Sequence, residues 1–215
     1  MIKSWSFSAW ELWKQCPRKY KCSKIDHLPD PPGRALLEGN RIHDLAQAYV
    51  EGRMKTLPPE LRMLKKQFAI LRKRGATCEA KRAYTDKWAP TEWDARDAYL
   101  RLKKDAEYVH PTTGVLHIVD YKTGNWYPSH SLQLELYVVA GLIDFPDVTE
   151  VEAHDWYTKT GREEHLRYAR SSLDHLKKIW ENRTLPMFEE VEFLPVVNQF
   201  CGNCNFKKGC PAWTE

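Results

Sequence analysis

The sequence predicts a mixed α/β (α+β) domain, with a short central mixed sheet flanked by helices. Apolar residues recur at helical spacing in the first third and near the end, whereas the middle of the chain has strand-like runs. The length of 215 residues suits one domain with a substantial core, so we expect a single domain over residues 1–215. Apolar residues make up 42% and charged residues 29%, which excludes a disordered or fibrous chain.

Three helices are predicted in the first third of the chain: from Ser8 onward, over 37–50 and over 60–74. Ser8 and Glu11 have the spacing of a capping box, which marks a helix start. In the second helix His43 lies at the edge of the apolar stripe. Gly75 is a suitable stop for the third helix.

The middle of the chain changes to strand patterns. Residues 99–109 and 115–121 are predicted strands, and the Pro- and Gly-containing segment between them is typical of a turn. We therefore expect an antiparallel hairpin. A helix over 132–143, a strand over 151–158 and a late helix over 172–182 complete the prediction.

Membrane and secreted classes are not expected. No apolar run approaches the roughly 20 residues that span a bilayer. Residues 1–5 lack the apolar stretch of a signal peptide, so we expect a cytoplasmic protein that does not bind membranes. Six cysteines in a reducing compartment are unsuited to a disulfide framework.

Basic residues are clustered although the net charge is only +4. Lys and Arg gather at 14–24, 62–74 and 101–104. Such clusters fit a groove for a polyanion, and solvated helix faces are the alternative. Trp126 and Tyr127 could stack on bases, or they could pack in a loop or the core. No feature indicates base-edge recognition, so little sequence specificity is expected.

A compact polar site is predicted at Asp120 and Lys122. Side chains alternate along a strand, so these two residues project from the same face. A carboxylate there could hold a divalent cation, and the lysine could orient water or offset charge on a phosphate. Asp105, on the preceding hairpin strand, could supply a second carboxylate. From the spacing alone, a surface ion pair between Asp120 and Lys122 is also possible.

Several short motifs in fixed order cover nearly the whole chain. They are Ser6-x-Ser8 through Cys16-Pro17-x-Lys19-Tyr20, Gly39-x-x-Ile42-His43, Lys104-Asp105, Val119-Asp120-Tyr121-Lys122-Thr123-Gly124 and Gln133-x-x-x-Tyr137. With these motifs the chain resembles the PD-(D/E)xK nuclease superfamily in its RecB-like branch. The resemblance implies a restriction-endonuclease-like core that hydrolyses DNA phosphodiesters with Mg²⁺ or Mn²⁺.

The resemblance also implies roles for individual residues. The metal would be held by His43, Asp105, Asp120 and the carbonyl of Tyr121. Lys122 would be the catalytic lysine, and Gln133 and Tyr137 would line the active-site groove.

One part of the pattern departs from the family. The family usually has a glycine and an apolar residue before its first aspartate, whereas this chain has Leu102-Lys103-Lys104. We favour Asp105 because its distance from Asp120 suits one hairpin. Asp94, Asp97 and Glu107 are neighbouring alternatives, and Glu79 on a preceding segment could contribute.

Three cysteines at the C-terminal end have metal-ligand spacing. Cys201-x₂-Cys204-x₅-Cys210 could wrap one metal centre, which usually needs a fourth ligand. The resemblance supplies Cys16 as that ligand. It implies a [4Fe–4S] cluster, as in the AddB nuclease domain and the CRISPR-adaptation exonucleases. Segments 1–36 and 183–215 would then join as an iron–sulfur subregion.

The occupant and the fourth ligand of the cysteine site stay open. Zinc is the rival occupant, because four-cysteine sites commonly hold zinc. Cys22 is a second candidate for the fourth ligand, and Cys78 is expected to be an idle thiol.

The combined prediction is an exonuclease acting on single-stranded or frayed DNA ends, with recombination or repair proteins as partners. The first alternative is a catalytically inactive nucleic-acid-binding or scaffolding protein on the same fold. The second is a zinc-stabilised interaction module.

Overall fold

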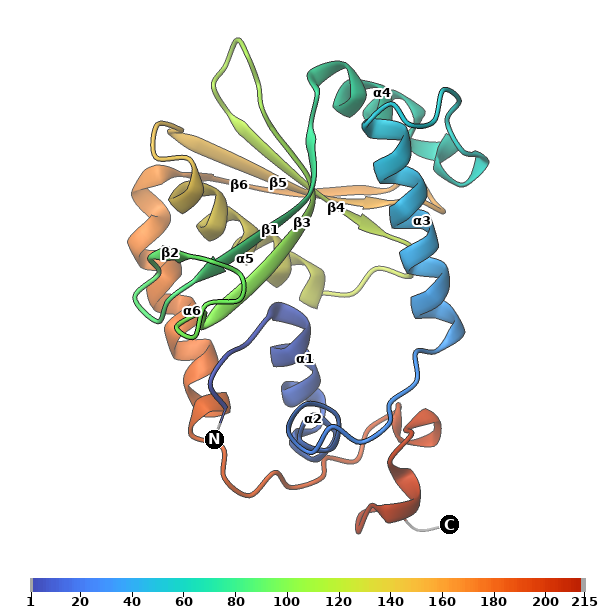
Figure 1. Ribbon diagram of the computed structural model, residues 1–215, viewed down its shortest axis with the longest axis vertical. Coiled ribbons are helices and arrows are strands. Elements are labelled where there is room, and N and C mark those ends of the chain that lie inside the picture. Colours follow the sequence, from blue (N-terminus) through green and yellow to red (C-terminus); the bar gives the residue numbers. More distant parts are fainter. Residues whose placement is uncertain (1, 214–215) are drawn as a thin grey trace. The chain divides into compact units, whose positions relative to one another are not determined.

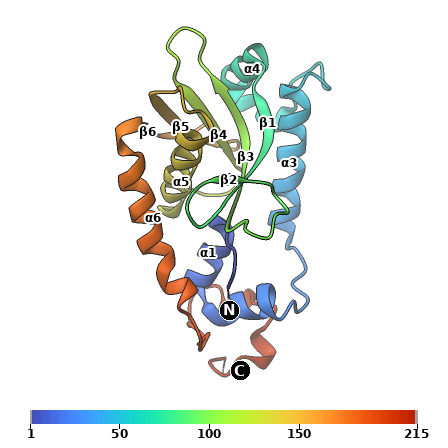
Figure 2. The same cartoon turned by 60° about the vertical axis from the view of Figure 1, so that its left-hand side comes forward.

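A computed structural model of the chain describes residues 2–213 (Figures 1 and 2). The chain divides into two compact units. One unit comprises Gly33–Lys178. The other combines the N-terminal residues up to Pro32 with the C-terminal residues from Ile179 onward.

The unit Gly33–Lys178 contains one six-stranded mixed sheet, ordered β2-β1-β3-β4-β5-β6. The strands are β1 (Thr77–Tyr84), β2 (Pro90–Thr91), β3 (Leu100–Val109), β4 (Leu116–Lys122), β5 (Glu150–Tyr157) and β6 (Glu163–Ala169). Neighbouring strands are antiparallel except β4 and β5, which are parallel. A parallel pair needs a crossover connection, and helix α5 (Ser129–Asp144) supplies it.

Helix α5 packs closely against one face of the sheet. Its residues 134–142 are all buried. Gly141 permits this approach, because a Cβ atom there would lie 2.8 Å from side-chain carbons of Leu116 and Ile118 on β4. Larger side chains at this position would force the helix off the strand. The packing holds the polar residues of α5 beside the end of β4.

The other face of the sheet is covered by α3 (Arg34–Val50) and α4 (Lys65–Arg74), with a 3₁₀ turn at Pro59–Leu64 between them. Apolar residues from these elements form a buried cluster with strand residues: Ile42, Ala46, Val50, Leu61, Leu64, Phe68, Leu71, Ala76, Ala106, Val119, Tyr121 and Trp156. Ile42 and Ala46 are one helical turn apart and face the sheet together. His43 follows Ile42 and therefore lies at the edge of this packed face.

Strands β3 and β4 separate partway along their length. Their pairing runs from Val109↔Leu116 to Ala106↔Val119 and stops there. At the next position the Asp105 carboxylate accepts the backbone N–H of Tyr121 at 2.6 Å. Opposite, on β1, Glu79 has a φ of 56°, which a residue other than glycine rarely adopts. The sheet is therefore irregular where the polar residues gather.

The second unit is built around aromatic packing. It contains α1 (Phe7–Gln15), α2 (Pro17–Tyr20), a π-helical turn at Lys21–Ile25, the last turns of α6 (Leu173–Phe188) and 3₁₀ turns at Cys201–Asn203 and Lys207–Gly209. Trp180 is fully buried among Trp5, Phe7 and Trp10, with ring centroids 5.4–6.2 Å apart. The Trp10 indole N–H donates to the Arg183 carbonyl at 3.2 Å, which ties α1 to α6.

The predicted elements are present with shifted ends. The antiparallel hairpin is confirmed, and Gly75 ends α4 in the left-handed conformation. The start of α1 at Ser8 was wrong: Ser6 is the N-cap, and its hydroxyl accepts the Ala9 N–H at 3.2 Å. The predicted helix 60–74 is a 3₁₀ turn followed by α4.

Strands β1, β2 and β6 were not predicted. β1 mixes charged and small residues, and β6 is a sheet edge whose side chains alternate between exposed and half-buried. Neither has the apolar alternation that marks a strand in sequence. The mixed sheet with helices on both faces still confirms the predicted fold class. Among residues 2–213, no helix is long and apolar enough to cross a membrane.

Candidate active site

His43, Asp105 and Tyr121 meet where β3 leaves β4. The His43 ring has its Nδ1 atom 3.1 Å from Asp105 Oδ1 and its Nε2 atom 2.9 Å from the Tyr121 carbonyl oxygen. Both partners are acceptors, so the ring is held most favourably with a proton on each nitrogen. Burial opposes this charge, but the hydrogen bond to Asp105 and the charges of Asp105 and Asp120 raise the pKa of His43 to about 9.

Asp120 and Lys122 lie on the face of β4 that α5 covers. Lys122 Nζ is 2.7 Å from Asp120 Oδ2 and donates to Gln133 Oε1 at 2.6 Å. Tyr137, one helical turn after Gln133, donates its hydroxyl toward Asp120 Oδ1 at 2.9 Å. The Gln133 amide also donates to Asp120 Oδ1 at 3.2 Å. The structure thus brings together four residues that the sequence placed in one site.

Lys122 carries a firmly held positive charge. Burial disfavours the ammonium group, but the nearby carboxylates, Asp120 foremost and then Asp155, raise the pKa of Lys122 above its ordinary value. The amine is therefore protonated at neutral pH and cannot accept a proton from water. It can donate hydrogen bonds and offset negative charge.

Glu79 joins the same site from β1. One ligand atom each from His43, Glu79 and Asp105 lies within 4.8 Å of the other two. Glu79 also pairs with Lys103, the residue two places before Asp105. From the sequence, Glu79 was a residue that could contribute, and the structure places it beside Asp105.

Asp94, Asp97 and Glu107, the remaining candidates for the Asp105 position, lie away from the site. Asp94 and Asp97 are exposed in the loop before β3, and Asp97 accepts a hydrogen bond from the Thr91 hydroxyl. Glu107 is buried and forms ion pairs with Lys104 and Arg82. None of these three carboxylates faces His43.

The donor set at the strand end suits a hard divalent cation. Burial and the charge of Asp120 raise the pKa of Asp105, because the neighbouring negative charge repels the ionised Asp105 carboxylate. A cation between them would remove this repulsion. Carboxylate and carbonyl oxygens are the ligands that magnesium and manganese prefer, and an imidazole can complete the set. The residues present therefore fit a metal of this class.

Three further residues extend the site and were not found from the sequence. Asp155 pairs in register with Asp120 across the parallel strands, and its Oδ1 atom lies 3.6 Å from Lys122 Nζ. His130 Nδ1 is 2.7 Å from the Tyr157 hydroxyl oxygen. Burial, followed by the charge of Lys122, lowers the pKa of His130 to about 4. The pairing of β4 with β5 brings Asp155 and Tyr157 to Lys122, and no local signal indicates it, whereas His130 comes from α5.

Several basic residues expected at a polyanion groove have internal partners. Lys104 is fully buried and lies 2.6 Å from Glu107 and 2.9 Å from Asp144, so its assignment to a groove was wrong. Arg18 donates to the Gly209 carbonyl at 2.6 Å, and Lys21 pairs with Asp26. In contrast, the lysines at 65, 66 and 73 on α4 are exposed.

The aromatic pair after β4 is open to solvent. Trp126 and Tyr127 have relative exposures of 44% and 48%. The Arg162 guanidinium lies 4.9 Å from the Trp126 ring centroid. Core packing is therefore excluded for both rings, while stacking on a base stays a prediction.

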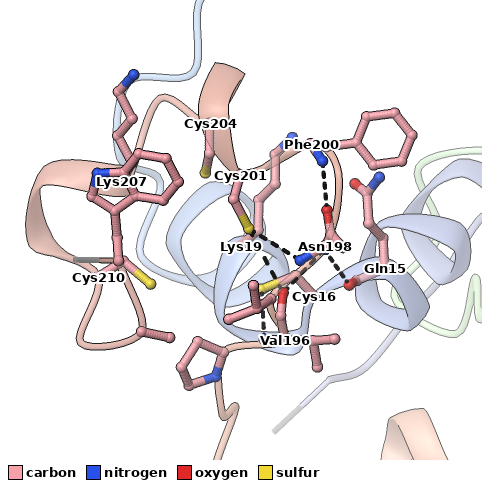
Figure 3. Close-up of a pocket in the computed structure, with 14 residues that line it drawn as sticks. Gln15, Cys16, Lys19, Val196, Asn198, Phe200, Cys201, Cys204, Lys207 and Cys210 are labelled. Atoms are coloured by element: carbon pink, nitrogen blue, oxygen red, sulfur yellow. Dashed lines mark hydrogen bonds between the residues drawn. The ribbon is translucent and has the colours of Figure 1, made fainter. Parts of the chain in front are cut away.

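The four predicted cluster ligands lie around one pocket in the second unit. Figure 3 shows Cys16, Cys201, Cys204 and Cys210 lining it, together with Lys19 and Lys207. Backbone N–H groups point at two of the thiols: Val196 N–H to Cys16 Sγ at 3.5 Å and Asn198 N–H to Cys201 Sγ at 3.3 Å. Donors of this kind stabilise thiolate charge.

The remaining cysteines lie outside the lining of this pocket. Cys22 is buried in the same unit, and burial raises the pKa of its thiol. Cys78 lies on β1 in the sheet unit, where burial raises the pKa of its thiol to about 12. All six cysteines are free thiols.

Comparison with known proteins identifies the family. A model of the PD-(D/E)XK nuclease superfamily matches residues 4–211, so the chain belongs to that superfamily and is a nuclease by family. Its mixed sheet with flanking helices is consistent with the restriction-endonuclease-like fold of the family. A comparison with curated proteins found no significant match.

Two solved structures are similar to the chain. One is called a "putative exonuclease" from Eubacterium rectale, with 13% identity and a TM-score of 0.53, covering 100% of this chain and 90% of that chain. The other is called SSO0001, with 11% identity and a TM-score of 0.44, covering 100% of this chain and 89% of that chain. At 13% identity the first likeness bears on the fold alone.

Asp155 gives a testable pH dependence of stability. Burial is the main cause that raises its pKa to about 8, against the opposing charge of Lys122. A carboxyl group with a higher pKa in the folded state favours folding at low pH, so this contribution is lost as pH rises from about 4 to about 8. We expect Asp155→Asn to flatten the fall in the free energy of unfolding between about pH 5 and 8, measured by urea denaturation. Exposed Asp147→Asn is the control, and equal pH slopes for the two variants would contradict the assignment.

Proposed function

We propose that this protein is a metal-dependent deoxyribonuclease that hydrolyses phosphodiester bonds at the end of β4. The observation that carries the proposal is that Asp105 contacts His43 and also binds the backbone N–H of Tyr121, the residue between Asp120 and Lys122. Membership of the nuclease superfamily agrees with it.

The proposed metal ligands are His43, Asp105, Asp120 and the Tyr121 carbonyl, with Glu79 close by. When bound, Mg²⁺ or Mn²⁺ would lower the pKa of a water molecule and offset charge on the phosphoryl oxygens. The two ring nitrogens of His43 lie against Asp105 and the Tyr121 carbonyl, so these groups are already close enough to share one cation.

Lys122 has the proposed role of catalytic lysine. Its ammonium group would orient the attacking water or stabilise the pentacovalent phosphate, because it stays charged at neutral pH. Gln133 accepts one of its hydrogen bonds, and Tyr137 fixes the Asp120 carboxylate. These two α5 residues would hold the reacting groups in position.

The proposed substrate is linear DNA, single-stranded or frayed, cut from an end with little sequence specificity. The exposed rings of Trp126 and Tyr127 offer stacking surfaces that suit unpaired bases. Exposed lysines on α4 could contact phosphates. Recombination or repair proteins are the proposed partners, and six free cysteines fit a cytoplasmic setting.

Replacement of Lys122 tests the assigned chemistry. We expect Lys122→Met to lower the cleavage rate of linear single-stranded DNA by about 10²–10³-fold, because one preorganised cation is lost from the transition state. DNA affinity, measured by fluorescence anisotropy, should stay the same. Lys87→Met, at an exposed loop position, is the control and should cleave normally. Full activity in Lys122→Met would refute the mechanism. If the wild-type protein bound DNA but did not cleave it in Mg²⁺ or Mn²⁺, it would be an inactive binding protein.

Substrate topology tests the exonuclease mode. We expect the wild-type protein to degrade linear single-stranded DNA to short products and to leave circular single-stranded DNA intact. With the 5′ end blocked in one substrate and the 3′ end in another, degradation should stop in only one of them. The blocked end of that substrate is the end from which cleavage starts. Cleavage of the circle at a rate similar to that of the linear strand would show an endonuclease instead, while the metal site would be unaffected.

We also propose that Cys16, Cys201, Cys204 and Cys210 hold a [4Fe–4S] cluster, as in the AddB-like branch of the family. In support, these four thiols line one pocket. A single tetrahedral zinc would draw its thiolates to roughly 3.8 Å of one another, given Zn–S bonds of about 2.3 Å. Within residues 2–213, no group of three potential ligand atoms within 4.8 Å of one another includes a cysteine sulfur. A larger multi-iron centre suits the wider spacing.

The proposed cluster is structural. Metal–thiolate bonds would tie Cys16 to the C-terminal cysteines across a long loop, making segments 1–36 and 183–215 one iron–sulfur region of a single nuclease domain. The cluster would stabilise the fold by linking the two ends of the chain.

Cysteine variants test this assignment. Cys204→Ser should lose most of the iron and the brown colour of anaerobically purified protein and should lower the melting temperature, because a cluster ligand is removed. Cys78→Ser should keep the iron and the brown colour. Loss of iron in Cys22→Ser would show that Cys22, in place of Cys16, is the fourth ligand. Colourless wild-type protein carrying one zinc per chain would overturn the iron–sulfur assignment without affecting the nuclease proposal.

A further inference from the structure

A second group of potential metal ligands lies outside the nuclease site. It consists of His117 on β4 and Glu152 and His154 on β5. One ligand atom from each residue lies within 4.8 Å of the other two. All three side chains are half-buried rather than free in solvent.

Strand geometry separates this group from the nuclease site. Side chains alternate along β4, so His117 projects from the face opposite Asp120. The two residues are three positions apart, which corresponds to roughly 10 Å along a strand. On β5, Glu152 and His154 share a face, and Asp155 beside Lys122 lies on the other face. The two groups therefore cannot share one ion.

The ligand atoms are already close to coordination distances. His117 Nδ1 lies 3.1 Å from His154 Nε2, and Glu152 Oε1 lies 3.8 Å from the same His154 nitrogen. Tetrahedral zinc with bonds of about 2.0–2.1 Å requires ligand atoms roughly 3.3 Å apart. Small side-chain rotations would bring all three atoms to this spacing. Two histidines and one glutamate form a known type of zinc ligand set.

The ring nitrogens of His117 and His154 face each other. These two nitrogens can share only one proton, which a metal ion would displace. Arg167 lies 3.8 Å from Glu152 Oε2, the oxygen that does not face His154.

We propose that His117, Glu152 and His154 form a Zn²⁺ site. The fourth ligand would be water or His165 on β6, which is in register with His154, with ring centroids 6.0 Å apart. Imidazole and carboxylate ligands favour zinc over magnesium. The ion would cross-link β4 to β5, the parallel pair of the sheet that carries Asp120, Lys122 and Asp155 on its other face.

Co²⁺ binding tests the site in the full-length chain, purified with its cysteine centre. The titrations use a His43→Gln background, so that the histidine of the nuclease site contributes no signal. We expect one equivalent of Co²⁺ with the absorption of a tetrahedral site, displaced by Zn²⁺. Glu152→Gln should weaken this binding by at least about tenfold. His175→Gln, at an exposed position on α6, should leave it unchanged.

Thermal unfolding provides a second test of the zinc site, independent of the Co²⁺ titrations. Zn²⁺ should raise the melting temperature of His175→Gln and not that of Glu152→Gln, because only the former keeps the ligand set. His154→Gln should behave as Glu152→Gln if it folds. Identical Co²⁺ titrations for Glu152→Gln and His175→Gln, or no Zn²⁺-dependent rise in His175→Gln, would overturn the proposal.

Discussion

The candidate active site depends on the carboxylate of Asp105. One of its oxygens accepts the Tyr121 N–H at 2.6 Å, which in a regular sheet would pair with a backbone carbonyl. Its other oxygen faces His43. A single side chain thus ends the pairing of β3 with β4 and ties α3 to the sheet. If the two strands stayed paired, the Tyr121 N–H would be used within the ladder and would not hold the Asp105 carboxylate.

Charges on the other side of β3 are used to hold the fold. Lys104, next to Asp105, is fully buried with Glu107 and Asp144, and Arg82 joins the same two carboxylates. Burying such a group of charges costs desolvation free energy. Removal of one member would strongly destabilise the fold, because the remaining buried charges would lose their partner. The consecutive residues Lys104 and Asp105 therefore have separate tasks: one anchors α5 to the sheet, and the other forms the site.

The sequence predicts the local parts of the site well. The Asp120-x-Lys122 spacing and the hairpin with Asp105 follow from strand alternation and turn chemistry over a short stretch of chain. His43 comes from a helix much earlier in the chain, and only the family resemblance connects it to the hairpin. Glu79 and Asp155 depend on the pairing of β1 with β3 and of β4 with β5. Strand pairing across long separations leaves no periodic trace in a single sequence, which is why Asp155 was missed and Glu79 was only a possible contributor.

The three ligand sets in the chain differ in chemistry, and this difference allows them to discriminate between metals. The strand end with Asp105 and Asp120 offers mainly oxygen donors, the pocket with Cys16 offers thiols, and the pair His117 and His154 offers imidazoles. Hard oxygen donors suit magnesium or manganese, thiolates suit iron–sulfur centres or zinc, and imidazole with carboxylate suits zinc. Raw affinity would favour zinc at any nitrogen-bearing site, His43 included. The proposed site on the opposite face of β4 offers two imidazoles, whereas the nuclease site offers one, so zinc would bind preferentially at the former.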